Sequence, residues 1–186
     1  MITRQSSIKK AVHHVHTIET NPSADSYGTP KWLYYYYCQF FGIKPKLDVC
    51  ANHFIHCCDD YFTIDDDMFK HAIKVDFYMN PFYSQVQECM DWAWKQVRDN
   101  NVNALICVNA QLGAEWFRKS LWEPYRKDAK NGCYGKRVDL EVVPKRVKFL
   151  DRFGNIPVYI DKDGKKHENT AMYWTVFAKL VAGATL

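Results

Sequence analysis

Two polar stretches stand directly after apolar segments, which is where ligands bind in proteins built on an open α/β sheet. The first is Asp48–Asn52, whose acid lies within an apolar run, where an unpartnered carboxylate costs free energy. That carboxylate can accept hydrogen bonds from the ammonium or hydroxyl groups of a ligand, or it can merely cap the next turn. The second is Asn80–Tyr83, whose sequence Asn-Pro-Phe-Tyr is by itself more often a turn than an active site. Both stretches are candidates for a binding site.

A third candidate is a group of cysteines and histidines at short spacing. Thiolates and imidazoles are the ligands that zinc prefers, so a zinc site is an open alternative. The group comprises Cys50, His53, His56, Cys57 and Cys58. Because Cys133 and His167 stand alone, no second pair with zinc spacing follows, and we expect no metal. The acids Asp65–Asp67 form either a solvated turn or a contact to a hard cation, but a contiguous triplet lacks the alternating ligands of a calcium loop.

The composition indicates a soluble, mildly basic globule. With 186 residues, of which 47% are hydrophobic and 25% charged, the chain can bury the core of one domain and is too apolar for wholesale disorder. Its uncharged stretches are too short to span a membrane. The 25 Lys and Arg residues against 21 Asp and Glu give a net charge of +4, which permits a nucleic-acid partner without demonstrating one.

The cysteines and the beginning of the chain indicate a protein of a reducing compartment. Seven cysteines are an odd number, and most lie in apolar segments, as reduced core thiols do. Residues 1–26 are polar and lack the apolar run of a signal peptide. We therefore expect a flexible arm over 1–26, a single domain over 27–186, and a cytoplasmic protein.

The elements that position the candidate residues follow from periodicity and from Pro and Gly. Thr29 as a cap, Pro30 in the first turn and Gly42 as a stop predict a helix over the aromatic run 32–41, although a buried strand rich in Tyr is an alternative. Ser84 with Gln87 resembles a capping box before a second helix that ends near 99–101. A third helix is predicted over 113–121, interrupted or ended by Pro124, followed by a loop over 127–136.

The strands complete an α/β pattern. They are predicted over 47–51, 74–79, 104–110, 138–143, 146–150, 158–160 and 171–180. Alternation of strands and helices in the first two thirds predicts a mostly parallel sheet with helices on both faces. The strand-rich last third predicts an antiparallel extension at its end.

Taken in order, the short motifs resemble a known family. Asn-Pro-Phe-Tyr is close to Asn-Pro-Pro-Tyr, the signature of methyltransferases that act on the amino group of adenine or cytosine. The other motifs are Thr29-Pro30, Asp48-Val49-Cys50-Ala51, Cys57, Tyr61-Phe62-Thr63, Asp66-Asp67, Trp92, 104–110, Trp116-Phe117 and 145–149. Over Tyr27 to Leu180 the chain resembles the phage-type, Dam-like DNA N6-adenine methyltransferases found in phages and prophages.

The resemblance implies a Rossmann-like fold, S-adenosylmethionine as cofactor, and the N6 amine of adenine in double-stranded DNA as methyl acceptor. In that family the Asn side-chain oxygen and the first Pro carbonyl accept hydrogen bonds from the exocyclic amine and orient its lone pair toward the methyl donor. The aromatic ring stacks on a base flipped out of the duplex. The implied catalytic residues are Asn80, Pro81, Phe82 and Tyr83.

The resemblance also implies a cofactor site. Thr29–Pro30 would pack over S-adenosylmethionine, Asp48 would face its ammonium group, and Asp66 or Asp67 would lie near its adenosine. The implied cofactor-binding residues are Thr29, Pro30, Asp48, Cys50, Ala51, Asp66 and Asp67.

The sequence departs from the family pattern at named positions. Phe82 replaces the second Pro, the strand at Asp48 lacks the glycines of the usual cofactor loop, and Lys145 replaces the customary Gly before Arg146. The Lys and Arg residues over 125–152 either track DNA phosphates or form a solvated face. The alternative function is a nonenzymatic DNA-binding or zinc-stabilised protein of a phage or mobile element, with a degenerate methyltransferase site.

Overall fold

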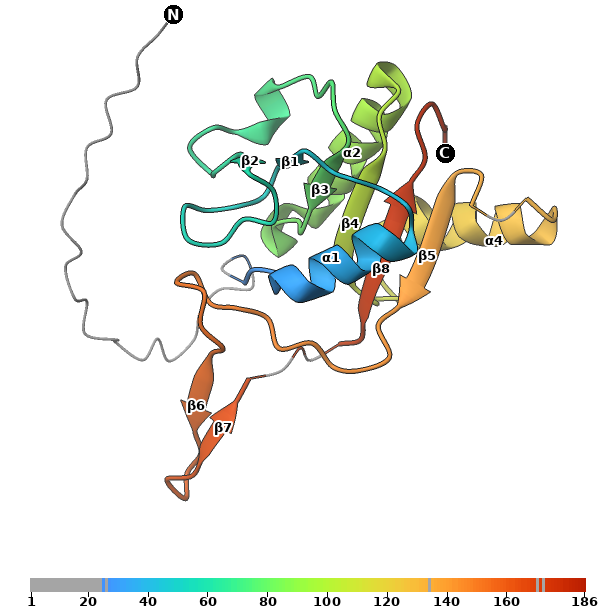
Figure 1. Ribbon diagram of the computed structural model, residues 1–186. Helices are drawn as coiled ribbons and strands as arrows, with labels where there is room; N and C mark the ends of the chain where they lie inside the picture. Colours follow the sequence, from blue (N-terminus) through green and yellow to red (C-terminus); the bar gives the residue numbers. More distant parts are fainter. Residues whose placement is uncertain (1–24, 26, 134, 170, 172) are drawn as a thin grey trace, which may run out of the picture.

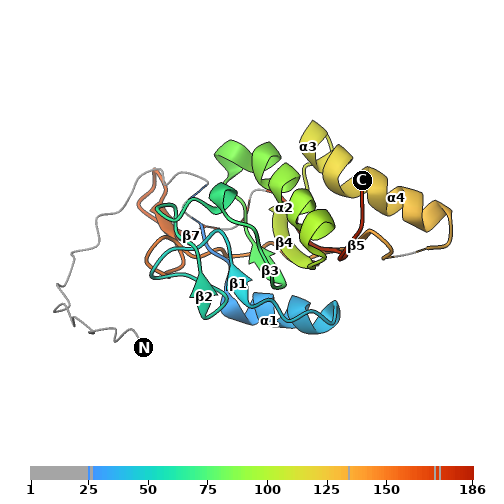
Figure 2. The same cartoon turned by 90° about the horizontal axis from the view of Figure 1, so that it is seen from above.

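The computed structural model describes residues 25, 27–133, 135–169, 171 and 173–186, which form a six-stranded sheet and a separate two-stranded one (Figure 1). The arm predicted over residues 1–26 lies, apart from Asp25, outside the described residues. Helices cover both faces of the six-stranded sheet, with α1 on one side and α2, α3 and α4 on the other (Figure 2).

Most strands of the large sheet run in one direction. In spatial order they are β2 (Asp60–Tyr61), β1 (Leu47–Asp48), β3 (Phe77–Met79), β4 (Ala104–Asn109), β8 (Thr175–Leu180) and β5 (Val138–Val142). The pairs β2–β1, β1–β3 and β3–β4 are parallel, whereas β8 is antiparallel to both β4 and β5. The predicted mostly parallel sheet with an antiparallel C-terminal extension is confirmed.

The central strands divide the core into two layers. Side chains on a strand alternate between faces, so Tyr78 of β3 and Leu105 of β4 pack against α1 (Lys31–Phe40). Their neighbours Phe77 and Ile106 pack on the other face against α2 (Val86–Asn100). The residues of β3 and β4 that pack into these two layers are almost wholly buried. The sheet is therefore a rigid platform for the loops at its edges.

The helix α1 forms where it was predicted, but its cap was wrongly predicted. Gly42 ends the helix with a φ of +60°, a conformation that glycine adopts without the penalty of a Cβ. The N-cap position is Pro30, which makes no side-chain cap. Thr29 is buried, and its Oγ1 accepts a 2.6 Å hydrogen bond from the Tyr78 hydroxyl. The threonine therefore ties α1 to β3.

The predicted capping box of α2 is also wrong. Residues Tyr83–Gln85 form a short 3₁₀ turn (η3), and α2 begins at Val86 without a side-chain cap. The backbone N–H of Ser84 donates to Asp25 Oδ1 at 3.0 Å, and Gln87 Nε2 donates to Asp91 within the helix. Both partners of the predicted box are thus engaged elsewhere.

The segment after β4 is helical past the proline that was predicted to interrupt or end it. It comprises α3 (Glu115–Phe117), a π-helical stretch η4 (Arg118–Trp122) and α4 (Glu123–Lys130). Pro124 falls in the first turn of α4, where a proline is tolerated. The predicted loop over 127–136 begins after Lys130 because α4 continues to that residue. The buried Asp128 then binds Arg137 at 2.6 Å and holds the start of β5.

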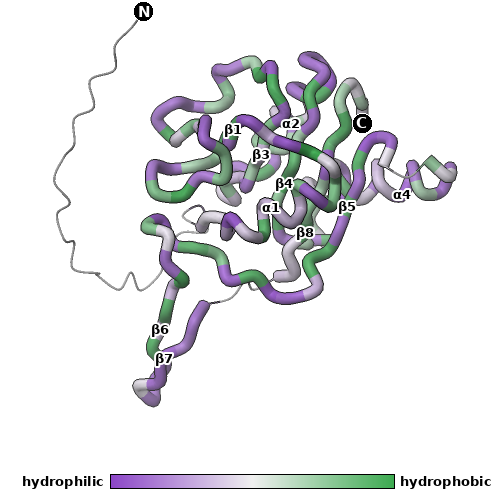
Figure 3. The backbone as a smooth tube through the Cα atoms, viewed as in Figure 1, coloured by the Kyte–Doolittle hydropathy of each residue, from purple (hydrophilic) through white to green (hydrophobic). Residues whose placement is uncertain are grey.

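In the last third of the chain, one predicted strand does not form and one observed strand was not predicted. The predicted strand over 146–150 forms no ladder, although Leu150 makes an isolated antiparallel bridge with Gly28. The strands β6 (Val158–Ile160) and β7 (Lys166–Glu168) form a hairpin that projects from the sheet (Figure 1). β7 is hydrophilic along its length, so it carried no apolar signal (Figure 3).

Candidate active site

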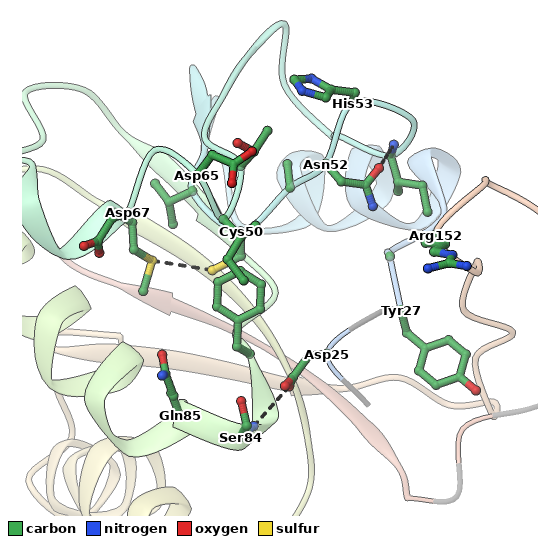
Figure 4. A pocket seen from close by; sticks show the side chains of 18 of the residues that line it. Asp25, Tyr27, Cys50, Asn52, His53, Asp65, Asp67, Ser84, Gln85 and Arg152 are labelled. Atoms are coloured by element: carbon green, nitrogen blue, oxygen red, sulfur yellow. Dashed lines mark hydrogen bonds between the residues drawn. The ribbon is translucent and has the colours of Figure 1, made fainter. Parts of the chain in front are cut away.

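The strand order creates a crevice at the carboxyl edge of the sheet. The chain leaves β1 toward β2 on one side, and β3 lies on the other side of β1, so the loops after β1 and β3 diverge. Ligands bind at such switch points in open α/β sheets. A cavity of about 930 Å³ lies there, bordered by Cys50 and Ala51 after β1 and by Phe82 and Ser84 after β3 (Figure 4). Its size suits a small-molecule ligand.

Asp48 lies beneath this cavity and organises the loop that borders it. Its side chain is 3% exposed, and its Oδ2 accepts a 2.8 Å hydrogen bond from the Cys57 N–H. Its Oδ1 accepts a longer one, at 3.3 Å, from the Cys50 N–H. The carboxylate therefore joins both ends of the 50–57 loop. Burial raises the pKa of Asp48 to about 6, although the two amide hydrogen bonds oppose the rise.

The same loop contributes two residues that were not predicted to contact a cofactor, Asn52 and His53. Asn52 Oδ1 accepts hydrogen bonds from the N–H groups of Phe54 at 2.8 Å and Ile55 at 2.9 Å, which closes a tight turn at the cavity rim. His53 lines the same rim and approaches the Tyr61 hydroxyl at 3.1 Å. Asn is a frequent turn former, and this is the signal that could have identified Asn52.

Gly28 lets the incoming chain pass close to this loop. A Cβ at that position would lie 2.3 Å from Ile55 Cγ2, closer than two carbon atoms can approach. Gly28 pairs with Leu150 through two backbone hydrogen bonds of 2.8 and 2.9 Å. The glycine therefore allows Tyr27–Gly28 to form one wall of the cavity, and Arg152 borders the cavity on the same side (Figure 4).

The three consecutive acids have different surroundings. Asp66 closes a turn, because its Oδ2 accepts hydrogen bonds from the Thr63 N–H at 2.7 Å and the Thr63 hydroxyl at 2.9 Å. Asp65 and Asp67 line the cavity instead. Asp67 has a φ of +52° and pairs with Lys70 at 2.9 Å, which lowers its pKa. The geometry therefore favours Asp65 and Asp67 over Asp66 as ligand contacts.

Asn80 stands directly after β3 with its amide held in one orientation. Its Nδ2 donates a 2.8 Å hydrogen bond to the Tyr27 carbonyl. Within the described part of the chain, no hydrogen bond to its Oδ1 is found, so this oxygen remains an available acceptor. Phe82 has a φ of −65°, the value that a proline ring imposes. Its backbone is thus compatible with the proline of the usual motif, and its ring lines the cavity.

Tyr83 is anchored through its hydroxyl, which accepts a 2.8 Å hydrogen bond from the Asn109 N–H at the end of β4.

We expect Tyr83→Phe to lower the free energy of unfolding by about 1–2 kcal/mol, because the Asn109 amide loses its partner. Urea denaturation measures the change. Tyr159→Phe is the matched control, since its ring is 53% exposed on the β6–β7 hairpin. Equal losses in both variants would contradict the anchoring role.

The structure brings only some of the predicted cofactor residues to the large cavity, and Asp48 and Asp66 line neither this cavity nor the groove beside it. Cys50, Ala51 and Asp67 line the large cavity. Thr29 and Pro30 line a neighbouring groove of about 590 Å³ on the side of α1. The segment that borders the large cavity is instead the preceding Tyr27–Gly28.

The cysteine and histidine cluster is dispersed by the fold. The Cys57 thiol lies 3.8 Å from the Thr29 carbonyl, and the Cys58 thiol lies 3.6 Å from the Pro45 carbonyl. Within the described ranges no three His, Cys, Asp or Glu side chains are placed to hold a metal ion. The zinc alternative therefore gains no support from the geometry. In the same ranges, no helix is both long and apolar enough to cross a membrane.

Comparison with known proteins agrees with this geometry. A family model described as DNA N-6-adenine-methyltransferase (Dam) matches residues 16–174. No curated protein matches the sequence. The matched range contains the loops after β1 and β3 and the segments that line both cavities.

Proposed function

Since the chain belongs to the DNA N-6-adenine-methyltransferase (Dam) family, we propose that it transfers the methyl group of S-adenosylmethionine to the N6 amine of adenine in double-stranded DNA. The observation that carries the proposal is the position of Asn80. This residue directly follows β3, and its Nδ2 is bonded to Tyr27, which lines the cavity of about 930 Å³. Among the described residues no group donates to its Oδ1, which is therefore available as an acceptor. We further propose that the sheet is a Rossmann-like cofactor-binding fold.

The residues around the large cavity fit S-adenosylmethionine by size and by charge. The volume lies within the range of small-molecule sites. Carboxylates at Asp65 and Asp67 would accept hydrogen bonds from the ribose hydroxyls. The negative charge of Asp48 beneath the floor would attract the ammonium group, and Asp48 also holds Cys50 against the cavity. When bound, S-adenosylmethionine supplies an electrophilic methyl group.

The chain's own residues would orient the methyl acceptor. The Tyr27 carbonyl fixes Asn80 Nδ2, and this leaves Oδ1 to accept a hydrogen bond from the adenine amine. The Pro81 carbonyl would accept the second proton of that amine, so that the nitrogen lone pair faces the methyl donor. This arrangement accelerates a direct displacement through position and electrostatics and needs no covalent nucleophile.

Tyr83 would support the base that has left the duplex. Flipping costs a few kcal/mol, and stacking on an aromatic ring returns about 1–3 kcal/mol. Because the Tyr83 hydroxyl is tied to Asn109, the ring is held at a fixed position at the carboxyl edge. A preorganised ring loses little conformational entropy when the base arrives.

The three acids give a test of the cofactor placement. We expect Asp65→Asn and Asp67→Asn each to weaken S-adenosylmethionine binding about tenfold, because each removes a charge-assisted hydrogen bond. Asp66→Asn is the matched control and should change the affinity by less than about threefold, since Asp66 serves the Thr63 turn. Isothermal titration calorimetry measures the affinities. A loss confined to Asp66→Asn would place the cofactor differently.

Methyl transfer itself is the direct test of the function. Labelled S-adenosylmethionine is mixed with adenine-containing duplex DNA and excess protein, and the digested product is analysed for N6-methyladenine. Incorporation at N6 is expected. Binding of S-adenosylmethionine without methylation of any adenine would instead indicate a degenerate site. Absence of cofactor binding together with stoichiometric zinc would favour the nonenzymatic alternative.

A further inference from the structure

A second groove, of about 590 Å³, runs beside the first turn of α1. Its walls come from 29–32, 54–56 and 143–156. The last of these segments follows β5 and leads to the β6–β7 hairpin (Figure 1). Four cationic side chains line it, and no carboxylate is among its lining residues. These cations are Lys31, Lys145, Arg146 and Lys148. A groove lined by charges of one sign concentrates ligands of the opposite sign, so the groove suits an anion.

Most of this positive charge is not neutralised within the protein. Lys148 forms an exposed ion pair with Glu168 of β7. Arg146 donates a long hydrogen bond, at 3.4 Å, to the Ala171 carbonyl, which carries no net charge. Across the described residues, neither Lys31 nor Lys145 has a carboxylate within ion-pair distance. Three of the four cations therefore keep their full charge for a partner.

Two exposed aromatic rings lie in the same groove. Trp32 and Phe54 line it, yet their side chains are 69% and 70% exposed. Phe54 also contacts Phe153 with ring centroids 5.9 Å apart, and Phe153 carries the Arg152 guanidinium 4.9 Å above its ring. Exposed aromatic rings interleaved with cations are what nucleic-acid surfaces use, because sugars and bases stack on the rings while cations hold phosphates.

The groove adjoins the candidate active site. Ile55 lines both the groove and the large cavity, and the Gly28–Leu150 bridge runs between them. We propose that this groove binds the sugar-phosphate backbone of the DNA strand next to the target adenine, with Lys31, Lys145 and Arg146 at phosphates. This inference rests on the proposed function, because it assumes that the large cavity and Asn80 act on a base of the same DNA.

The fold also provides a matched control. Of the cations over 125–152 that were considered for phosphate contacts, Lys127 and Lys130 lie on α4, which covers the opposite face of the sheet from α1 (Figure 2). They are exposed, as Lys145 is, but they are remote from the groove. If any surface cation served equally well, Lys127 would matter as much as Lys145.

The salt dependence of DNA binding tests the groove. We expect Lys145→Gln and Arg146→Gln each to reduce the steepness with which log affinity falls against log salt concentration by about 0.9. The loss of affinity relative to the wild type should therefore be about eightfold larger at 0.1 M salt than at 1 M salt. Lys127→Gln should leave the slope unchanged. Fluorescence anisotropy with a labelled duplex measures binding without any need for catalysis. Wild-type slopes in the two groove variants, or an equal change in Lys127→Gln, would overturn the proposal.

A second comparison separates DNA from other polyanions. Trp32→Ala should lower the affinity for DNA about tenfold and leave the affinity for inorganic polyphosphate, which has neither sugars nor bases, unchanged. Equal losses for DNA and polyphosphate, or none for DNA, would overturn a nucleic-acid site. All variants should bind S-adenosylmethionine as the wild type does. If the wild type binds DNA through the groove but transfers no methyl group, the proposed function fails and the groove assignment stands.

Discussion

Asn80→Ala is expected to lower the single-turnover rate of methyl transfer by about 10²–10³, the usual effect of removing one preorganised polar group. The affinity for S-adenosylmethionine should stay unchanged, because Asn80 is placed at the methyl acceptor. The expected size reflects the Tyr27 carbonyl, which holds Asn80 Nδ2 at 2.8 Å and fixes the amide before the base arrives. An oxygen held in advance needs no reorganisation in the transition state.

Asn80→Asp provides the comparison. It keeps an oxygen acceptor but turns the donor to Tyr27 into a second acceptor, so it should retain more activity than Asn80→Ala and less than the wild type. The rates are measured with duplex DNA under saturating cofactor, and calorimetry of S-adenosylmethionine binding is the control. Wild-type rates for Asn80→Ala, alongside measurable wild-type activity, would show that this loop is not the active site.

The position of this loop could be predicted from the sequence because local rules and topology agree there. An apolar strand that stops at Asn80-Pro81 must end at the carboxyl edge of a parallel sheet, and ligands bind at that edge. The partner of Asn80 could not be predicted. It is a backbone carbonyl of Tyr27, and nothing in the side chain of Tyr27 marks its carbonyl as a partner.

The two wrongly predicted helix caps have a shared physical cause, which is competition by distant residues for local hydrogen-bonding groups. Thr29 would cap α1 in isolation, but the Tyr78 hydroxyl binds its Oγ1 and pulls it into the core. In a capping box the Gln87 side chain would accept from the Ser84 N–H, but Asp25 Oδ1 accepts from that N–H instead. A local pattern predicts which groups can bond, whereas tertiary packing decides which partner they find.

The lining of the large cavity was predicted unevenly for a similar reason. Cys50 and Ala51 follow β1 directly, and the sheet places them at the cavity. The three acids at 65–67 could not be distinguished by sequence, because their roles depend on a turn closed by Thr63. Arg152 comes from the irregular segment after β5, and only the Gly28–Leu150 bridge brings that segment to the cavity.

The burial of Asp48 predicts how the free energy of unfolding changes with pH. Its pKa is raised by burial from 3.8 to about 6 in the folded protein, so between these values the folded state holds a proton that the unfolded state has lost. The stability contributed by Asp48 is therefore greatest below about pH 4 and falls as the pH rises through 6. A shift of this size corresponds to about 3 kcal/mol. Relative to Asp48→Asn, the wild type should lose about that much stability between pH 4 and pH 7.

Urea denaturation at several pH values measures this difference, and Asp48→Asn is the suitable reference because it keeps the shape and one acceptor for the Cys57 N–H. A difference that does not vary with pH would mean that the carboxyl group is not desolvated.

The affinity for S-adenosylmethionine at different pH values gives a second test of Asp48. Its ammonium group would stabilise the carboxylate, so S-adenosylmethionine should bind the wild type more tightly as the pH rises from 5 to 7. Asp48→Asn should show no such rise and should bind about 1–3 kcal/mol more weakly at pH 7. Equal affinities at pH 7 would confine Asp48 to holding the 50–57 loop.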